Sequence, residues 1–359
     1  MRCTHLIESP RPISRRGSRL LQLPRELRDK IYAAVFSSTR LTFGERRVTR
    51  ISRKRIRTAP NALALLHVCP QLNTETRTMW IAQVQFSFED PETMLDKLSK
   101  LDESTTSKIR HIRMSGQPLM IQPLDCDDDV YYRTASVLQL LPSLRLDTLT
   151  VLGCQPVEVA YQTLDDLIKR GNGWKELRFV SQDSAMLGYS VSEAQCSWDL
   201  VERIYRRQPQ PKAWKQVILA RDGKRSGASV EVYRSTRRNA PGSVLDPQER
   251  ERFQQLPHQD QLPTYGFTKE VGLVSGPEAS REILVVVKRG RGADIAEKIT
   301  PPFDEENDIR AWSDKMCWAQ IKKATQWYPS DEEEDQESEV DKYSNIDDIL
   351  WPNLNEQSS

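Results

Sequence analysis

The sequence predicts an α+β fold, in which an N-terminal helical module packs on an irregular βα-repeat mixed sheet. Short helical patterns with apolar stripes occupy most of the chain before residue 90. After them, strand and helix patterns alternate, with strand starts at residues 109, 147, 175 and 215, and this spacing is typical of βα units. We therefore expect a helical module over 19–90 and a sheet domain over 91–328, between disordered tails over 1–18 and 329–359.

The first predicted helix begins at Pro24, whose fixed φ suits the first helical position. An apolar stripe follows at helical spacing, formed by Leu27, Ile31, Ala34 and Val35. Charged residues take the other face, namely Arg25, Arg28, Asp29 and Lys30. A helix of two or three turns is marginal alone in water, so we expect other helices to cover the apolar stripe.

Two further short helices are predicted over 61–69 and 71–80, separated by Pro70. Apolar and polar residues then alternate over 84–88, which predicts a strand. The two helices are the expected cover for the stripe of the first helix.

This part of the chain resembles the F-box. The run Leu-Pro-x-Glu-Leu-x-x-x-Ile at 23–31 carries the first half of the resemblance. The second half is Ala-Leu-Leu-His-Val-Cys-Pro-Gln-Leu-Asn-Thr-Glu-Thr at 64–76, followed by an aromatic residue and Phe-Ser-Phe, and it is similar to the divergent F-box-like segment common in filamentous fungi. The resemblance covers about a quarter of the chain, roughly residues 20–90.

The resemblance implies a small helical module that binds the S-phase-kinase-associated adaptor subunit of a cullin–RING ubiquitin ligase. The chain would then be a non-catalytic, substrate-recruiting subunit, with a protein substrate that the sequence does not name. The residues implied to contact the adaptor are Leu23, Pro24, Leu27 and Ile31. An insert over 40–59 departs from the family, because it is longer and more basic than the usual F-box connection.

The sheet domain begins with a helix expected over 90–101. Strands are then expected over 109–114, 146–152 and 174–180, and helices over 130–141, 157–169 and 193–206. Alternating strands and helices predict a parallel sheet with helices packed on it. The strands at 146–152 and 174–180 resemble those of degenerate leucine-rich repeats, which in F-box proteins often form the substrate-receiving surface.

The remaining part of the sheet domain is predicted to end the parallel pattern. A strand at 217–220 and another at 230–233 flank Asp222-Gly223-Lys224, which is typical of a hairpin. Residues 235–280 have little periodicity and are expected to form a long loop. The run 282–288 is rich in β-branched residues and predicts a strand that pairs with the hairpin, and a helix is expected over 305–327.

Charge is distributed unevenly along the chain, although its formal net charge is only +1. The insert carries a dense set of basic residues, namely Arg46, Arg47, Arg50, Arg53, Lys54, Arg55 and Arg57. They suggest a second hypothesis, a nucleic-acid or chromatin-associated protein that binds polyanions, although no aromatic residue between 46 and 57 would stack on bases. A third hypothesis is a scaffold that keeps the F-box fold without binding the adaptor.

Composition and motifs argue against several other classes of protein. Nucleotide-binding glycine motifs and the nucleophile-elbow motif are missing, and with only four histidines we expect no enzymatic activity and no cofactor. The six cysteines form no Cys-x-x-Cys pair, so we expect reduced thiols and no metal site. No apolar run approaches the roughly 20 residues of a membrane span. We therefore expect a cytoplasmic or nuclear protein that does not bind membranes.

Overall fold

The structure is a computed structural model of the 359-residue chain. It describes residues 18–47, 53–55, 63–123, 130–154, 156–188, 190–193, 202–205, 208–256, 271–274, 276–297, 308–312 and 317–326. Apart from Ser18, the predicted tails 1–18 and 329–359 lie outside these residues.

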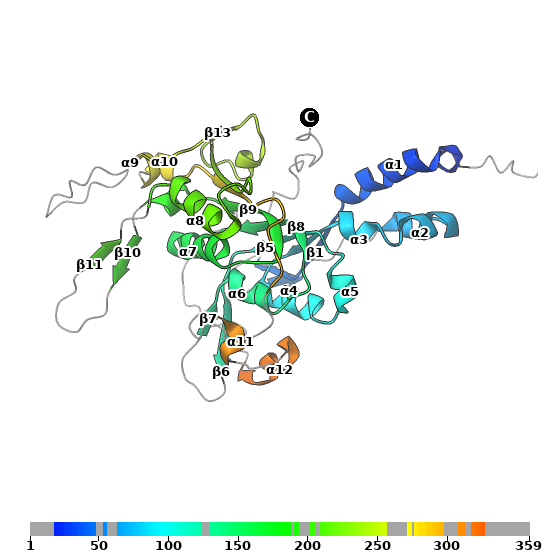
Figure 1. Cartoon of the computed structure of the whole chain (residues 1–359), viewed down its shortest axis with the longest axis horizontal. Coiled ribbons are helices and arrows are strands. Elements are labelled where there is room, and N and C mark those ends of the chain that lie inside the picture. Colours follow the sequence, from blue (N-terminus) through cyan, green and yellow to red (C-terminus); the bar gives the residue numbers. More distant parts are fainter. Residues whose placement is uncertain are drawn as a thin grey trace, which may run out of the picture.

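An eight-stranded sheet forms the centre of the mixed α/β fold (Figure 1). Its strands, in spatial order, are β1 (Arg40–Phe43), β4 (Gln85–Phe88), β5 (His111–Ser115), β8 (Leu146–Leu152), β9 (Trp174–Ser181), β14 (Ile283–Lys288), β12 (Ser229–Ser235) and β13 (Arg250–Arg252). The first five are parallel to one another, and β14, β12 and β13 each pair antiparallel with the preceding strand. The expectation of a mostly parallel sheet is confirmed.

Helices cover one face of this sheet, which we call the inner face. They are α4 (Pro91–Leu98), α6 (Thr134–Gln139), α7 (Val157–Lys169) and α8 (Lys212–Asp222). The parallel strands lie side by side in chain order, and right-handed crossovers that all advance in one direction leave their helices on the same face. The opposite face of the strands is called the outer face below.

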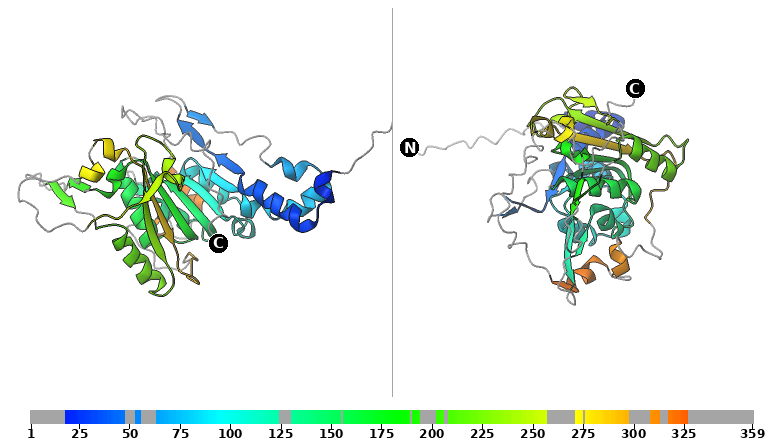
Figure 2. Two further views of the ribbon diagram at one scale, coloured as in Figure 1. Left: turned by 90° about the horizontal axis from the view of Figure 1, so that it is seen from above. Right: turned by 90° about the vertical axis from the view of Figure 1, so that its left-hand side faces the viewer.

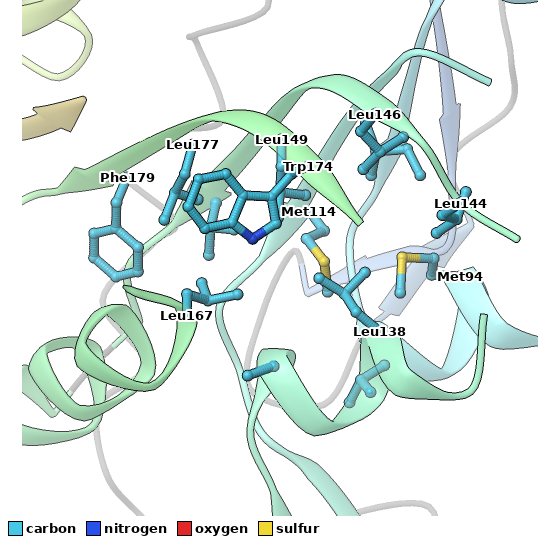
Figure 3. Packing of buried hydrophobic residues seen from close by; sticks show 14 of the residues in the cluster. Met94, Met114, Leu138, Leu144, Leu146, Leu149, Leu167, Trp174, Leu177 and Phe179 are labelled. Atoms are coloured by element: carbon cyan, nitrogen blue, oxygen red, sulfur yellow. The ribbon is translucent and has the colours of Figure 1, made fainter. Parts of the chain in front are cut away.

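The main hydrophobic core lies between the inner face and the helices. Figure 3 shows Leu138 of α6 and Leu167 of α7 beneath the buried ring of Trp174, at the start of β9. Strand residues alternate between the two faces: in β8, Leu149 and Val151 belong to this core, whereas Thr150 between them points to the outer face. A second apolar cluster, on the outer face, joins β9 and β14 to η4 (Ser243–Leu245).

The N-terminal part forms a helical arm that projects beyond β1 (Figures 1 and 2). The arm consists of η1 (Arg19–Gln22), α1 (Arg25–Ser37), η2 (Ala64–His67), α2 (Pro70–Thr76) and α3 (Trp80–Gln83). Its chain also supplies two strands, β1 and β4, to the eight-stranded sheet, so the sheet extends across the predicted boundary between residues 90 and 91.

The insert predicted over 40–59 is therefore partly a component of the sheet. Residues Arg40–Phe43 form the edge strand β1, in which Leu41 and Phe43 alternate onto the inner face. After Gly44, β2 (Glu45–Arg47) and β3 (Arg53–Arg55) pair as an antiparallel hairpin. The other residues of the insert, 48–52 and 56–59, are outside the described residues.

The strand predicted at 217–220 is wrong, because these residues lie in helix α8. Trp214 and Ile218 are four residues apart and both buried, which is a helical spacing. The helix ends at Gly223, whose φ of +96° most other residues avoid. The predicted hairpin is consequently absent from this described stretch, and β12 pairs instead with β14 and β13.

The helix predicted over 193–206 is also wrong at both ends. Residues Ser190–Glu193 form β10 and Glu202–Tyr205 form β11, an antiparallel pair that places Val191 opposite Ile204. Such β-branched pairs favour strands. The residues between these strands lie outside the described part of the chain.

The loop predicted over 235–280 contains regular structure. It includes η4, β13, α9 (Val271–Val274) and α10 (Gly276–Ala279). The buried carboxylate of Glu282 accepts hydrogen bonds from the backbone N–H of Gly242 at 2.7 Å and of Val244 at 3.1 Å, and so holds η4. A contact between residues so distant in sequence leaves no periodic signal, which explains why this part was predicted to be a loop.

Several predicted helices are shorter than expected. In 130–141, β7 (Val130–Tyr132) precedes α6, and β7 pairs with β6 (Leu119–Pro123). In 305–327, the described residues form α11 (Ile309–Trp312), α12 (Trp318–Lys323) and β15 (Thr325–Gln326), and β15 pairs with β6. The other short elements are α5 (Glu103–Thr106) and η3 (Ser184–Leu187). Among the described helices, none is long and apolar enough to cross a membrane.

Candidate protein-interaction surface

Helix α1 presents the residues that the sequence singled out for partner binding. Pro24 was predicted to be the first helical residue, but it is the N-cap, and the helix begins at Arg25. The carbonyl oxygen of Pro24 accepts hydrogen bonds from the backbone N–H of Leu27 and Arg28 at 3.2 Å each. The helix is therefore anchored at its start without a side-chain cap.

The face of α1 that packs on the protein is the reverse of the predicted one. The buried residues follow at intervals of four and are Arg28, Tyr32 and Phe36. The predicted apolar stripe faces solvent instead, with exposed fractions of 46% for Leu27, 39% for Ile31 and 41% for Val35. The prediction that Arg28 faces solvent and that other helices cover the apolar stripe was therefore wrong.

Burial of Arg28 is possible because Glu75 of α2 binds it through two hydrogen bonds. Arg28 Nε donates to Glu75 Oε2 at 3.0 Å, and Nη2 donates to Oε1 at 2.6 Å. Arg28 Nη1 also donates to the carbonyl oxygen of Leu23 at 2.6 Å, and the Tyr32 hydroxyl donates to Glu75 Oε2 at 2.8 Å. We call Arg28, Tyr32 and Glu75 the polar clamp, since it joins α1 to α2.

The clamp shifts the ionisation of its members. The hydrogen bonds from Arg28, above all, lower the pKa of Glu75 to about 2. Burial, followed by the hydrogen bond to Glu75, raises the pKa of the Tyr32 hydroxyl. Near neutral pH the clamp is accordingly a carboxylate bound to a guanidinium and a neutral phenol.

Because the clamp holds the polar face of α1 inward, the apolar face points outward. We call Leu27, Ile31 and Val35 the α1 stripe; Pro24, just before it, is exposed and Leu23 is half-buried. Three large apolar side chains on one rigid helix face are suited to binding the apolar surface of another protein. The four sequence-predicted residues thus lie in one short stretch, with Leu23 and Pro24 directly before α1 and Leu27 and Ile31 in its first half.

The basic residues predicted to bind polyanions gather on the β2–β3 hairpin. Its register sets Arg46 opposite Lys54 and Arg47 opposite Arg53, while Arg55 lies opposite Glu45. Arg50 and Arg57 lie outside the described residues. At two positions of the hairpin register, a basic residue is therefore paired with another basic residue.

Histidine and cysteine residues of the helical arm and the sheet do not form a metal-binding cluster within the described part of the chain. His67 is exposed and Cys69 is half-buried on the helical arm, whereas burial lowers the pKa of His111 in the sheet. In the described part of the chain, no three His, Cys, Asp or Glu side chains are placed to hold a metal ion.

Sequence reasoning missed Glu75 as a functional partner of α1. Arg28 and Tyr32 are four residues apart, but nothing local shows that a carboxylate 47 residues downstream binds Arg28. The available signal was an arginine at helical spacing with two large aromatic residues, Tyr32 and Phe36.

Comparisons of the chain with protein-family models, with curated proteins and with solved structures find no significant match.

Proposed function

We propose that the chain is a non-catalytic protein-interaction protein, and that it serves as the substrate-recruiting, F-box-type subunit of a cullin–RING ubiquitin ligase. The exposure of the α1 stripe supports this proposal most directly. The resemblance at 23–31 assigns adaptor binding to Leu23, Pro24, Leu27 and Ile31, and three of these side chains are open to a partner. The helix is held in place by Arg28 and Tyr32, which do not belong to the set assigned to adaptor binding.

In this proposal the helical arm binds the adaptor and the sheet domain holds the target. The parallel strands follow one another in chain order, and helices α4, α6 and α7 lie on the inner face of the sheet. A leucine-rich-repeat-like region would have this arrangement, and it would present its strands to a target. We propose that residues 19–90 bind the adaptor and that residues 91–328 bind the target.

A pull-down with the purified adaptor subunit tests the proposal. Wild-type protein is expected to retain the adaptor, and the double variant Leu27→Asp with Ile31→Asp is expected to lose it. Glu26→Gln is the matched control, since Glu26 is exposed on α1 away from the stripe and should leave binding unchanged. Circular dichroism of each variant shows whether α1 remains folded. A wild type without affinity for the adaptor, or equal binding by the double variant, contradicts the proposal.

The register of the hairpin favours a second candidate function, binding of a polyanion such as nucleic acid. Arg46, Arg47, Arg53 and Lys54 lie opposite one another in two pairs, and phosphates would offset their repulsion. The protein is then expected to bind a heparin column and to elute early when Arg53, Lys54 and Arg55 are changed to Gln. Changing Lys212, Lys215 and Arg221 of α8 to Gln removes equal charge elsewhere and is the control. If both variants elute at the same salt concentration, the hairpin is not the polyanion-binding site.

A further inference from the structure

Strands β7, β6 and β15 form a small sheet of their own, with β6 in the middle. Figure 1 shows β6 and β7 next to α11 and α12. One face of this small sheet is buried, because Leu119 and Ile121 of β6 and Tyr132 of β7 belong to the main hydrophobic core. The residues between them alternate onto the opposite face.

That opposite face carries an exposed apolar pair. Met120 of β6 lies directly opposite Tyr131 of β7, so both side chains are on the same face. Their exposed fractions are 36% for Met120 and 60% for Tyr131. A thioether on the middle strand, with an aromatic ring on one side, suits a second aromatic ring on its other side. The strand on that other side of β6 is β15.

The register of β15 indicates which residue comes next to Met120. β15 runs antiparallel to β6, and Gln326 lies opposite Gln122. Each step forward along β15 therefore corresponds to one step back along β6. The residues after 326 lie outside the described part of the chain. Continuing the register by two residues places Tyr328 opposite Met120.

The residue types that follow β15 suit both faces of such a strand. Trp327 and Tyr328 are aromatic, and aromatic residues favour strands. In the continued register, Trp327 shares the buried face with Ile121, and Tyr328 shares the exposed face. Pro329 then comes opposite Leu119, and because proline has no N–H to donate, the pairing is expected to end there.

Helix α12 fixes the chain just before β15. Trp318 Nε1 donates a hydrogen bond to Asp96 Oδ1 of α4 at 2.7 Å. Lys322 Nζ donates to Glu92 Oε1 at 2.6 Å and to Asp96 Oδ2 at 2.9 Å. The chain is therefore held beside β6 before the strand begins, and lengthening β15 requires only two further residues to be ordered.

We propose that residues 327–328 of the same chain extend β15 along β6 and cover the exposed apolar pair. Tyr328, Met120 and Tyr131 then form one row across three neighbouring strands, with the thioether between two aromatic rings. The extension also occupies an edge of β6 that a strand of another protein could otherwise pair with. The acidic segment 331–348 consequently leaves the protein from the small sheet. The proposal is independent of adaptor binding by α1.

Disulfide trapping in the full chain tests the proposal. Residues opposite each other on neighbouring strands have Cβ atoms about 5 Å apart, close enough for a disulfide after a small adjustment. The variant Met120→Cys with Tyr328→Cys is expected to form this disulfide under mild oxidation. In the control, Met120→Cys with Trp327→Cys, the second cysteine lies on the other face, so the yield should be several-fold lower. Mass spectrometry of non-reduced peptides measures both yields and separates these disulfides from any that involve native cysteines.

A second control tests whether a nearby flexible chain is enough to give the disulfide. Met120→Cys with Ser330→Cys keeps both aromatic residues and places the thiol two residues beyond the row, so its yield should also be several-fold lower. Circular dichroism shows whether each variant is folded. Similar yields in the three variants, or no disulfide in the folded Tyr328→Cys variant, would overturn the proposal. A disulfide that joins two chains, seen as a dimer on a non-reducing gel, would assign the exposed pair to a second copy and overturn it as well.

Discussion

Arg28 of α1 and Glu75 of α2 form a two-point ion pair, with N–O distances of 3.0 and 2.6 Å. This pair decides which side of α1 faces the protein. Both side chains are largely shielded from solvent, at 11% and 8% exposure, and removing either one leaves the other charged in a poorly hydrated site. The orientation of the α1 stripe, and with it the proposed adaptor site, depends on this contact.

Replacing Glu75 by Ala is expected to destabilise the packing of α1 on α2. Arg28 and the Tyr32 hydroxyl would lose their shared acceptor, and the midpoint of thermal unfolding should fall by several degrees. The matched control is Asp147→Ala, which breaks the more exposed pair between Lys175 and Asp147 and should change the midpoint little. Differential scanning calorimetry measures both. Equal shifts in the two variants would contradict a stabilising role for the clamp.

The clamp should also make stability depend on pH in the acid range. The pKa of Glu75 is about 2 in the folded chain against 4.5 for the free side chain, so its contribution is fully present above pH 4.5. As pH falls from 4.5 towards 2, the folded state must protonate Glu75 and this contribution is lost. The difference in unfolding free energy between wild type and Glu75→Gln, measured by urea denaturation, should narrow over that interval. A difference independent of pH would be inconsistent with the shifted pKa.

The sequence predicted that α1 exists and that it packs on the later helices, but it assigned the wrong face. Hydrophobic periodicity favours burying Leu27 and Ile31, whereas the structure buries Arg28 with Tyr32 and Phe36. The tertiary ion pair to Glu75 overrides the local pattern, and such a pair cannot be inferred from spacing within one helix. An exposed apolar stripe says more about function than a buried one, because burial explains apolar residues by packing alone, whereas their exposure on one helix face indicates a binding surface.

Elsewhere, long periodic segments were predicted well and short apolar runs were not. Strand β8 and helix α7 lie within one residue of the ranges expected for them. The run Val217–Ala220 was assigned to a strand, since four apolar residues fit a strand or a buried helix equally, and only its packing through Trp214 and Ile218 distinguishes the two.

Glu282 should give stability the opposite pH dependence. Burial raises its pKa to about 6 from 4.5, so the folded state disfavours its charged form. Between pH 4.5 and about 6 the folded chain binds the proton more tightly than the unfolded chain, and stability falls as pH rises. The shift corresponds to about 2 kcal/mol. Glu282→Gln should lack this decline while keeping an oxygen acceptor for the backbone of η4. Parallel pH profiles for wild type and variant in chemical denaturation would rule the expectation out.

The two faces of α1 should respond to truncation in opposite ways. Phe36 is fully buried, so Phe36→Ala should cost about 3–5 kcal/mol of unfolding free energy. Ile31 is exposed, so Ile31→Ala should cost less than about 1 kcal/mol. If the α1 stripe binds the adaptor, the ranking reverses in the complex: Ile31→Ala should weaken binding by roughly 1–2 kcal/mol while the folded fraction of Phe36→Ala retains its affinity. Urea denaturation and calorimetric titration measure the two quantities separately. A large loss of stability from Ile31→Ala would place the stripe in the core and refute the exposed orientation of α1.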